Sequence, residues 1–262
     1  MTRVVALVES RMASTRLPGK NLLPILGKPM LARLLERLKR CRMVDEVCVA
    51  TTRDAADDAL EALARVEGVA CHRGSVDDVL ERTLHAATAL KADVILEITG
   101  DCPLVDPAIA DAAVRRYLKG DVDYVANVLD RLTFPVGLDV QVYSRAALAE
   151  VSGLTDDPFD RGNVTPYFYR HPRRYRLLNL FAPPPLDRPY LLCVDYPVDF
   201  EVATAVYEAL YPRRAAFDAF DIIGLLDDHK ELAQRNARSV PIDYPHSTGA
   251  SAAQEELSFH AA

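Results

Sequence analysis

Short apolar runs alternate with amphipathic helical patterns in the first half of this 262-residue chain, and this alternation constrains the fold most. The apolar runs have the length and β-branched content of buried strands and lie at residues 4–8, 47–50, 69–71 and 93–98. Apolar residues at helical spacing follow each run, at residues 29–40, 54–66, 77–90 and 107–119. We therefore predict an α/β fold, a mostly parallel sheet with helices on both faces, in a single domain over residues 1–240.

A cationic loop follows the first apolar run. It combines basic residues with small hydroxyl and glycine residues, namely Ser10, Arg11, Ser14, Thr15, Arg16, Gly19 and Lys20. Parallel sheets bind ligands beyond the carboxyl ends of their strands, and backbone N–H groups with fixed positive charges hold phosphates. The spacings of a Walker loop and of a dinucleotide fingerprint are both absent. The loop is therefore a candidate phosphate site of another kind, and an exposed turn of solvated basic residues is the alternative.

A second candidate loop, Thr99 to Asp106, follows the fourth apolar run. Gly100 lets the backbone turn sharply and Pro103 fixes the exit, so Asp101 is held at a strand end. Mg²⁺ takes few protein carboxylates and completes its shell with water or phosphate oxygens. Asp101 is therefore a candidate ligand of nucleotide-bound Mg²⁺, although the pattern G-D-x-P also occurs in plain turns.

Three motifs in this order resemble one enzyme family: R-M-x-S-T-R-L-P-G-K from Arg11, T-G-D-C-P-L-V-D-P from Thr99, and V-D-Y-P-V-D-F from Val194. They resemble motifs of the cytidylyltransferases that make CMP-activated acidic sugars, and are most similar to SpsF-type proteins, relatives of CMP-Kdo synthetase. The resemblance covers about residues 3–240. It implies a nucleotide-diphospho-sugar transferase-like (Rossmann-like) fold and Mg²⁺-dependent transfer of CMP from CTP to a Kdo- or nonulosonate-like sugar. Pyrophosphate would be released, in surface polysaccharide or glycoconjugate biosynthesis.

The resemblance also implies roles for individual residues. It implies that Asp101 and Asp195 bind the metal and that they act in catalysis with Arg11 and Lys20. R-G-S-x-x-D-V-L is similar to a stretch at the rim of the family's nucleotide pocket. The implied nucleotide-binding residues are Ser10, Arg11, Ser14, Arg16, Lys20, Arg73, Gly74 and Asp101. Two positions depart from the family pattern: Glu9-Ser10 replaces Gln-Ala or Pro-Ala, and Ala13 replaces Gly.

Acceptor-binding residues are implied by two later segments. P-V-G-L-D-V-Q-V resembles a family segment that lines the acceptor pocket, which implies roles for Asp139 and for Gln141, where Glu is usual. R-x-N-V-T-P-Y resembles a family segment used for acceptor binding and dimerisation. Arg161 is a candidate for pairing an acceptor carboxylate, phosphate or phosphonate, because guanidinium binds such groups bidentately; a surface ion pair is the alternative.

The region around residues 156–176 is rich in aromatic residues and arginine, as are many protein interfaces. We expect a small arm at about residues 125–190 that supports a homodimer through Tyr167 or Phe168. A last core strand is expected at residues 191–194, and a flexible tail at residues 241–262.

Composition excludes several other classes of function. The net charge of −7 argues against nucleic acid as a partner, and the longest apolar run is too short to span a membrane. Because an apolar strand begins almost at the first residue and the five cysteines form no C-x-x-C pair, we expect no signal peptide and a cytoplasmic location. CTP and a small anionic acceptor are the expected partners.

Alternative functions remain open at this point. The acceptor could be a phosphonate or a polyol phosphate. A metal-dependent glycosyltransferase is a further alternative, because Asp121-Val122-Asp123 spells the D-x-D motif whose carboxylates can share one ion. Against it, a diphosphate donor needs fewer cations than the first loop offers.

Overall fold

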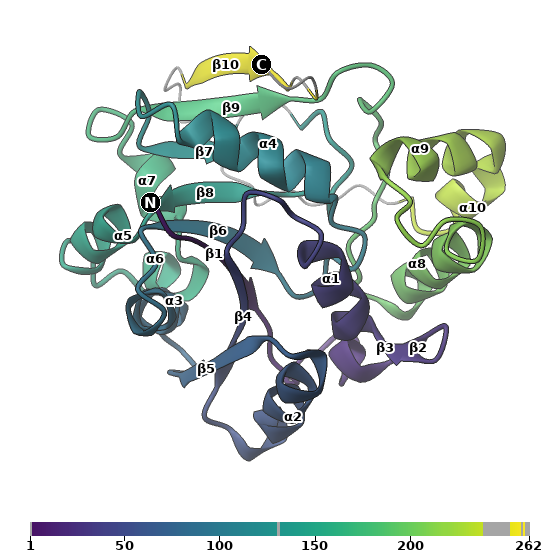
Figure 1. The fold of residues 1–262 in the computed structure, drawn as a ribbon, viewed down its shortest axis with the longest axis horizontal. Helices are drawn as coiled ribbons and strands as arrows, with labels where there is room; N and C mark the ends of the chain where they lie inside the picture. The colour runs from purple at the N-terminus through teal and green to yellow at the C-terminus, as the bar shows by residue number, and fades with distance from the viewer. Residues whose placement is uncertain (1, 130–131, 238–251, 258, 260–262) are drawn as a thin grey trace.

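A computed structural model describes residues 2–129, 132–237, 252–257 and 259, and Figure 1 shows the arrangement of their elements. Within these residues, eight strands form one sheet in the order β10-β9-β7-β8-β6-β1-β4-β5. The strands of this sheet are β1 (Val4–Glu9), β4 (Glu46–Thr52), β5 (Ala70–Gly74), β6 (Val94–Thr99), β7 (Tyr124–Ala126), β8 (Gln141–Ser144), β9 (Leu177–Phe181) and β10 (Ala253–Glu256). Two short strands, β2 (Pro24–Ile25) and β3 (Lys28–Pro29), pair separately.

Parallel pairing dominates the sheet. β1 lies between β4 and β6, and β4 pairs with β5, all in parallel. β8 runs antiparallel to both β6 and β7. The carboxyl ends of β1, β4, β5 and β6 therefore meet at one edge, as the alternation in the sequence predicted.

Helices cover both faces of the sheet. The α-helices are α1 (Met30–Leu38), α2 (Asp58–Glu67), α3 (Val79–Ala89), α4 (Pro107–Tyr117), α5 (Arg145–Ser152), α6 (Pro158–Asn163), α7 (Pro166–Arg170), α8 (Pro197–Leu210), α9 (Ala219–Asp228) and α10 (Lys230–Gln234). Single 3₁₀ turns are η1 (Lys20–Leu22) and η2 (Ala55–Asp57). Local signals set helix ends: Asp106 caps α4 by accepting from the Ala108 and Ile109 N–H groups, and Gly68, in the left-handed region, ends α2.

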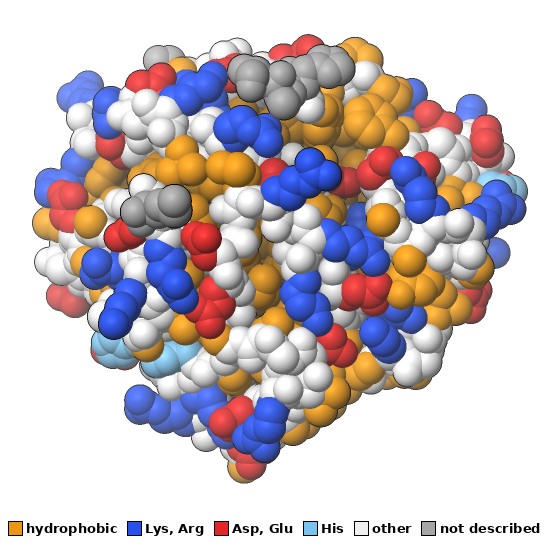
Figure 2. Space-filling model, viewed as in Figure 1, with side chains coloured by type: hydrophobic (Ala, Val, Ile, Leu, Met, Phe, Trp, Pro, Cys, Tyr) orange, Lys and Arg blue, Asp and Glu red, His pale blue; other side chains and the backbone are white. Residues whose placement is uncertain are grey.

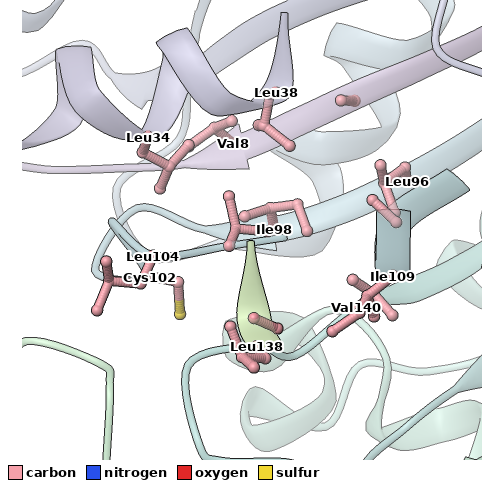
Figure 3. Packing of buried hydrophobic residues seen from close by; sticks show 14 of the residues in the cluster. Val8, Leu34, Leu38, Leu96, Ile98, Cys102, Leu104, Ile109, Leu138 and Val140 are labelled. Carbon is pink, nitrogen blue, oxygen red and sulfur yellow. The ribbon is translucent and has the colours of Figure 1, made fainter. Parts of the chain in front are cut away.

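Alternate residues of each strand bury themselves in two apolar clusters. Val8 and Ile98 face α1 and α4, and Figure 3 shows them packed against Leu34, Leu38 and Ile109. On the other face, Val5, Leu7 and Ile95 pack with residues of α3, α5 and α7. Burial of this strand set on both sides is what a helix-covered sheet requires.

The segment predicted as an arm, at about residues 125–190, contributes β8, β9 and most of β7 to the sheet. α5 and α6 pack beside α3. Phe168 is fully buried and stacks on Tyr124, with ring centroids 5.1 Å apart. Of the two residues predicted for a dimer interface, Tyr167 or Phe168, only Tyr167 is partly exposed, so the prediction now depends on Tyr167.

The expected strand at residues 191–194 is absent, and only a single bridge joins Leu191 to Val136. The backbone N–H groups of this segment bond to two different segments: Leu192 to the Val136 carbonyl at 2.6 Å, and Val194 to the Asp101 carbonyl at 2.8 Å. Because these hydrogen bonds go to two different segments, no continuous β-ladder forms. The apolar composition of residues 191–194 does not reveal which segments accept these bonds.

The described part of the expected flexible tail includes an edge strand, since β10 pairs in parallel with β9. Leu257 is buried against the same apolar cluster as β1. The expectation of a flexible tail thus does not hold for residues 253–257, while residues 241–251 lie outside the described residues. Among the helices of the described ranges, none has the length and apolar character needed to cross a membrane.

Among the described glycines, Gly137 leaves the least room for a Cβ atom. It has φ +104°, and a Cβ there would lie 2.4 Å from the Cys193 nitrogen. We expect Gly137→Ala to lower the free energy of unfolding by about 3 kcal/mol or more, because strained φ and displacement of the 191–194 segment both contribute. Gly120→Ala is the control: φ is +80° but no atom lies within 4 Å, so a loss of only about 1 kcal/mol is expected. Equal losses in urea unfolding would contradict this account.

Candidate active site

A cavity of about 640 Å³ opens at the carboxyl ends of β1 and β6. The cationic loop, the Thr99–Asp101 turn, the first turn of α3, the end of α6 and Asp195 line it. This is the position that parallel sheets offer to ligands. Ser10, Arg11, Ser14, Arg16, Lys20, Asp101 and Asp195 all line the cavity.

Lys20 forms the centre of the charged cluster. Its Nζ lies 3.1 Å from Asp101, 3.0 Å from Asp195 and 2.6 Å from the Val194 carbonyl oxygen, and the residue is 8% exposed. Burial by itself lowers the pKa of Lys20, but the charges and hydrogen bonds of Asp101 and Asp195 outweigh it and raise the pKa above the ordinary value. The ammonium group therefore stays charged, and the carboxylate groups of Asp101 and Asp195 both contact it.

The other basic residues of the loop differ in how they are engaged. Arg16 pairs with Asp195 at 2.7 Å and lies over the Tyr196 ring at 5.5 Å. The guanidinium of Arg11 has no ion pair or hydrogen bond to any residue of the described ranges, and it is exposed at the cavity. Arg11 is therefore free to meet an anion.

Backbone contacts fix the shape of the loop. Asp57 accepts from the Met12 N–H at 2.7 Å and from the Thr52 N–H at 3.1 Å, and Asn21 donates to the Arg11 carbonyl at 2.9 Å. A Cβ on Gly100 would lie 2.8 Å from the Glu9 carbonyl oxygen, so β1 and β6 can approach only because residue 100 is glycine.

The residues present fit a magnesium ion. Both carboxylate groups already converge on a single cation, the Lys20 ammonium. Mg²⁺ commonly binds through one or two carboxylates plus water and phosphate oxygens. In the described ranges, no three His, Cys, Asp or Glu side chains gather as a metal cage, and all five cysteines are free. A site of two carboxylates that relies on a bound phosphate is consistent with both findings.

Arg73 and Gly74 do not line the cavity. Arg73 donates to the Thr52 and Asp54 carbonyls and pairs with Asp58 and Glu61. Gly74 instead makes room for another residue, since a Cβ there would lie 2.7 Å from the Arg82 Cγ.

Arg82 lines the cavity, although sequence reasoning missed it. A signal was present, because Arg82 and Thr83 interrupt the apolar stripe of α3 formed by Leu80, Ala86 and Ala87. Burial lowers the pKa of the Arg82 guanidinium, and the charge of Glu9 opposes that effect. Burial raises the pKa of Glu9 to about 7, while Arg82 and a 3.0 Å hydrogen bond from Thr83 lower it.

Gln141 lies outside the cavity lining, in a buried polar network behind it. It pairs across the strands with Glu97, to which it donates at 3.3 Å, and it accepts from Thr165 at 2.8 Å and from Tyr124. Tyr143 donates to the other oxygen of Glu97. A glutamate at position 141 would place a second carboxylate opposite Glu97, which accounts physically for glutamine at this position.

The remaining acceptor candidates also lie outside the cavity lining. Asp139 is half-buried beside Cys102 and Cys193; burial first and then neighbouring charges, including that of Asp139, raise the pKa of both thiols. Arg161 pairs with Asp78 and donates to the Ser152 carbonyl at 3.0 Å. It thereby anchors α6, whose Gly162 and Asn163 line the cavity.

Asp121 and Asp123 are engaged in ion pairs distant from the cavity lining. Asp121 pairs with Arg116 at 2.6 Å, and Asp123 pairs with Arg176 at 2.8 Å. Because each carboxylate has its own arginine, the D-x-D pattern does not present two oxygens to one ion. On the face drawn in Figure 2, basic and acidic side chains are interspersed in the same way.

A family model described as Cytidylyltransferase matches residues 5–236. The spore coat polysaccharide biosynthesis protein SpsF of Bacillus subtilis is 31% identical over 240 residues, which cover 89% of this chain and 98% of the relative. The 3-deoxy-manno-octulosonate cytidylyltransferase of Geobacter metallireducens is 32% identical over 211 residues, 71% and 81% of the two chains. A solved structure of a cytidylyltransferase from Leptospira borgpetersenii has a TM-score of 0.84 at 30% identity and covers 91% of this chain and 100% of that one.

The buried acid Glu97 generates a pH-dependent prediction. Burial first, and then the charge of Glu9, raise the pKa of Glu97 well above 4.5, against the effect of the Tyr143 hydrogen bond. The folded protein thus keeps a proton that the unfolded chain loses, so the free energy of unfolding should fall by up to about 1.4 kcal/mol per pH unit above pH 4.5. Glu97→Gln removes this slope and keeps an acceptor for Tyr143.

Urea unfolding at pH 5, 6, 7 and 8 measures the effect. The stability of Glu97→Gln relative to the wild type should rise steadily over this range. A difference that stays constant with pH would mean that Glu97 is ionised in the folded protein.

Proposed function

Because this chain belongs to the cytidylyltransferase family, we propose that it transfers CMP from CTP to an acidic sugar of the Kdo or nonulosonate kind and releases pyrophosphate. Its fold is of the nucleotide-diphospho-sugar transferase-like kind. The observation that carries the proposal is the convergence of Lys20, Asp101 and Asp195 beside an unpaired Arg11 in one cavity. Fixed positive charge and a two-carboxylate cation site are what a nucleoside triphosphate requires.

The proposed reaction is an in-line displacement. An acceptor hydroxyl oxygen forms a bond to the α-phosphorus of CTP and loses its proton to solvent water. The bond from that phosphorus to the bridging oxygen breaks, and pyrophosphate leaves with the electron pair. Arg11, Arg16 and Lys20 neutralise phosphate charge in this scheme. The catalytic contribution of the chain is then positioning and electrostatic stabilisation.

Asp101 and Asp195 would hold Mg²⁺ in the proposed enzyme. When bound, the ion supplies charge stabilisation to the attacking and leaving oxygens. Lys20 keeps both carboxylates oriented toward the cavity, and Arg16 pairs with the same Oδ1 of Asp195 that Lys20 contacts.

The choice of an acidic sugar rests on the relatives. One is a 3-deoxy-manno-octulosonate cytidylyltransferase, and another is a spore coat polysaccharide biosynthesis protein, so we place the reaction in surface polysaccharide or glycoconjugate synthesis. A phosphonate or polyol phosphate acceptor would use the same phosphate chemistry. Five free cysteines support a reducing, cytoplasmic setting for the proposed enzyme.

The proposal predicts which nucleotide and which residues support turnover. With Mg²⁺ and an acidic-sugar acceptor, the enzyme should release pyrophosphate from CTP in preference to ATP, GTP and UTP. Asp101→Asn or Asp195→Asn should each lower kcat by about a hundredfold or more, because each carboxylate helps to hold the metal. Pyrophosphate release over the four nucleotides and a panel of acceptors, including a phosphonate and a polyol phosphate, is the measurement.

Asp121→Asn is the matched control, because Asp121 is paired with Arg116 outside the cavity lining. It should keep kcat within about twofold. Near-normal turnover of either site variant at saturating Mg²⁺ would remove that residue from the site. A hundredfold loss in the control would contradict the placement of Asp121 outside the site, and no pyrophosphate release from any of the four nucleotides would contradict the proposed reaction.

We further propose a homodimer that uses the surface of α5–α7, where Leu154 is 42% and Phe159 is 48% exposed beside Tyr167. Large exposed apolar side chains next to arginine are typical of interfaces. Light scattering at micromolar concentration should give about twice the 29.0 kDa chain mass. Phe159→Glu should shift the mass toward one chain with little change in Tm, since the side chain is exposed. A monomeric wild type at that concentration would disprove the dimer.

A further inference from the structure

Arg82 is a buried cation with spare donors at the cavity. The residue is 3% exposed, and its Nη1 donates to the Ser75 carbonyl at 2.6 Å. Its Nε is buried and has no hydrogen-bond partner, and its Nη2, which is not fully buried, makes no hydrogen bond or ion pair within the described ranges. A guanidinium with so few partners at 3% exposure is costly, so it requires an explanation. Since Arg82 lines the cavity, a ligand there can accept a hydrogen bond from Nη2.

Arg82 interacts with a different set of charges from Lys20. Glu9, Arg11, Asp57 and Asp78 act on Arg82, which therefore borders the phosphate loop at Arg11, whereas Lys20 interacts with the two metal-site aspartates. Arg82 is carried by α3, and α3 packs in the apolar cluster on one face of the sheet. Cys102 lies next to Asp101 and packs in the apolar cluster on the opposite face. The cavity thus joins two chemically different regions.

The region around Arg82 suits a neutral polar group better than an anion. Glu9 lines the cavity beside Arg82, and Thr83 donates to its Oε1 at 3.0 Å, which leaves Oε2 as an acceptor. A guanidinium with spare donors next to a carboxylate with a spare acceptor offers both kinds of hydrogen bond with little net charge. Val76 and Val79 also line the cavity, and Val79, about one helical turn before Arg82 in α3, offers apolar contact to a flat ring.

A cytosine ring has the complementary edge. Its N4 amine donates, and its N3 and O2 accept; carboxylate side chains accept from the N4 amine, and arginine donates to ring acceptors. Uracil reverses two of these positions, because N3 donates and O4 accepts. A donor from Arg82 and an acceptor from Glu9 would therefore pair with cytosine and oppose uracil.

We propose that Arg82 and Glu9 read the edge of the nucleobase and select cytosine over uracil. This inference rests on the proposed function, because it assumes that the triphosphate lies on Arg11, Arg16 and Lys20. Gly74 is then a positioning residue for base selection, since only glycine leaves room for the Arg82 side chain.

Calorimetric titration of CTP, UTP and inorganic triphosphate tests the proposal. The wild type should bind CTP at least tenfold more tightly than UTP. Arg82→Lys keeps the charge but loses the planar donors, so it should weaken CTP binding at least tenfold and leave inorganic triphosphate within twofold. Glu9→Gln should narrow the ratio of CTP to UTP affinity at least threefold, because an amide can donate to O4.

Arg33→Lys is the matched control. Arg33 is also 3% exposed, but it donates to the Ile25 and Leu26 carbonyls and lies outside the cavity lining. Arg33→Lys should leave the ratio of CTP to UTP affinity unchanged even if Tm falls. If Arg82→Lys does not fold, Glu9→Gln decides the matter alone.

Two results would overturn the inference. The first is an unchanged ratio of CTP to UTP affinity in the folded variants. The second is an equal weakening of CTP and inorganic triphosphate binding in Arg82→Lys, which would make Arg82 a phosphate ligand. Failure of the proposed function looks different. In that case the variants change base selectivity as expected, but the wild type releases no pyrophosphate from CTP with any acidic acceptor.

Discussion

The salt-bridged ammonium of Lys20 joins three parts of the chain that are far apart in the sequence. Asp101 and Asp195 lie 81 and 175 residues from it, and the Val194 carbonyl is bound at the same point. Two carboxylates at neighbouring loop ends would repel each other without a cation between them. The cationic loop, the turn after β6 and the approach to α8 therefore keep their mutual positions through one buried charge. The shape of the cavity depends on that arrangement.

The sequence predicted the parts of the structure that arise from local patterns. The strands β1, β4, β5 and β6 follow from short apolar runs, and the helices α1 to α4 follow from apolar residues at a period of 3.6, because both patterns lie within a single element. The gathering of Lys20 and Asp101 could also be predicted, since parallel strands deliver their carboxyl ends to one edge. The resemblance to known motifs placed Asp195 in this group, which spacing alone could not do.

Features that depend on distant partners were missed. Arg161 could equally bind an acceptor or a neighbouring acid, and only the fold brings Asp78 to it. Gln141 departs from the family pattern for a reason that lies 44 residues away, in Glu97 on the adjacent antiparallel strand. The segment 191–194 has a strand-like composition, yet its backbone bonds go to two loops. In each case the deciding interaction crosses between elements, where single-sequence patterns carry no information.

The pairing of β10 with β9 has a consequence for colloidal behaviour. An outermost strand with free N–H and C=O groups is a template for pairing with another molecule, and many proteins cover such edges. Here the outermost strand is β10, whose residues Gln254, Glu255 and Glu256 make the edge polar and charged, and it covers the apolar strand β9. β10 lies beyond residue 236, where the match to the family ends. A chain shortened after the matched region would keep every cavity-lining residue but present β9 as an open edge. Its tendency to aggregate would then rise although its catalytic apparatus was intact.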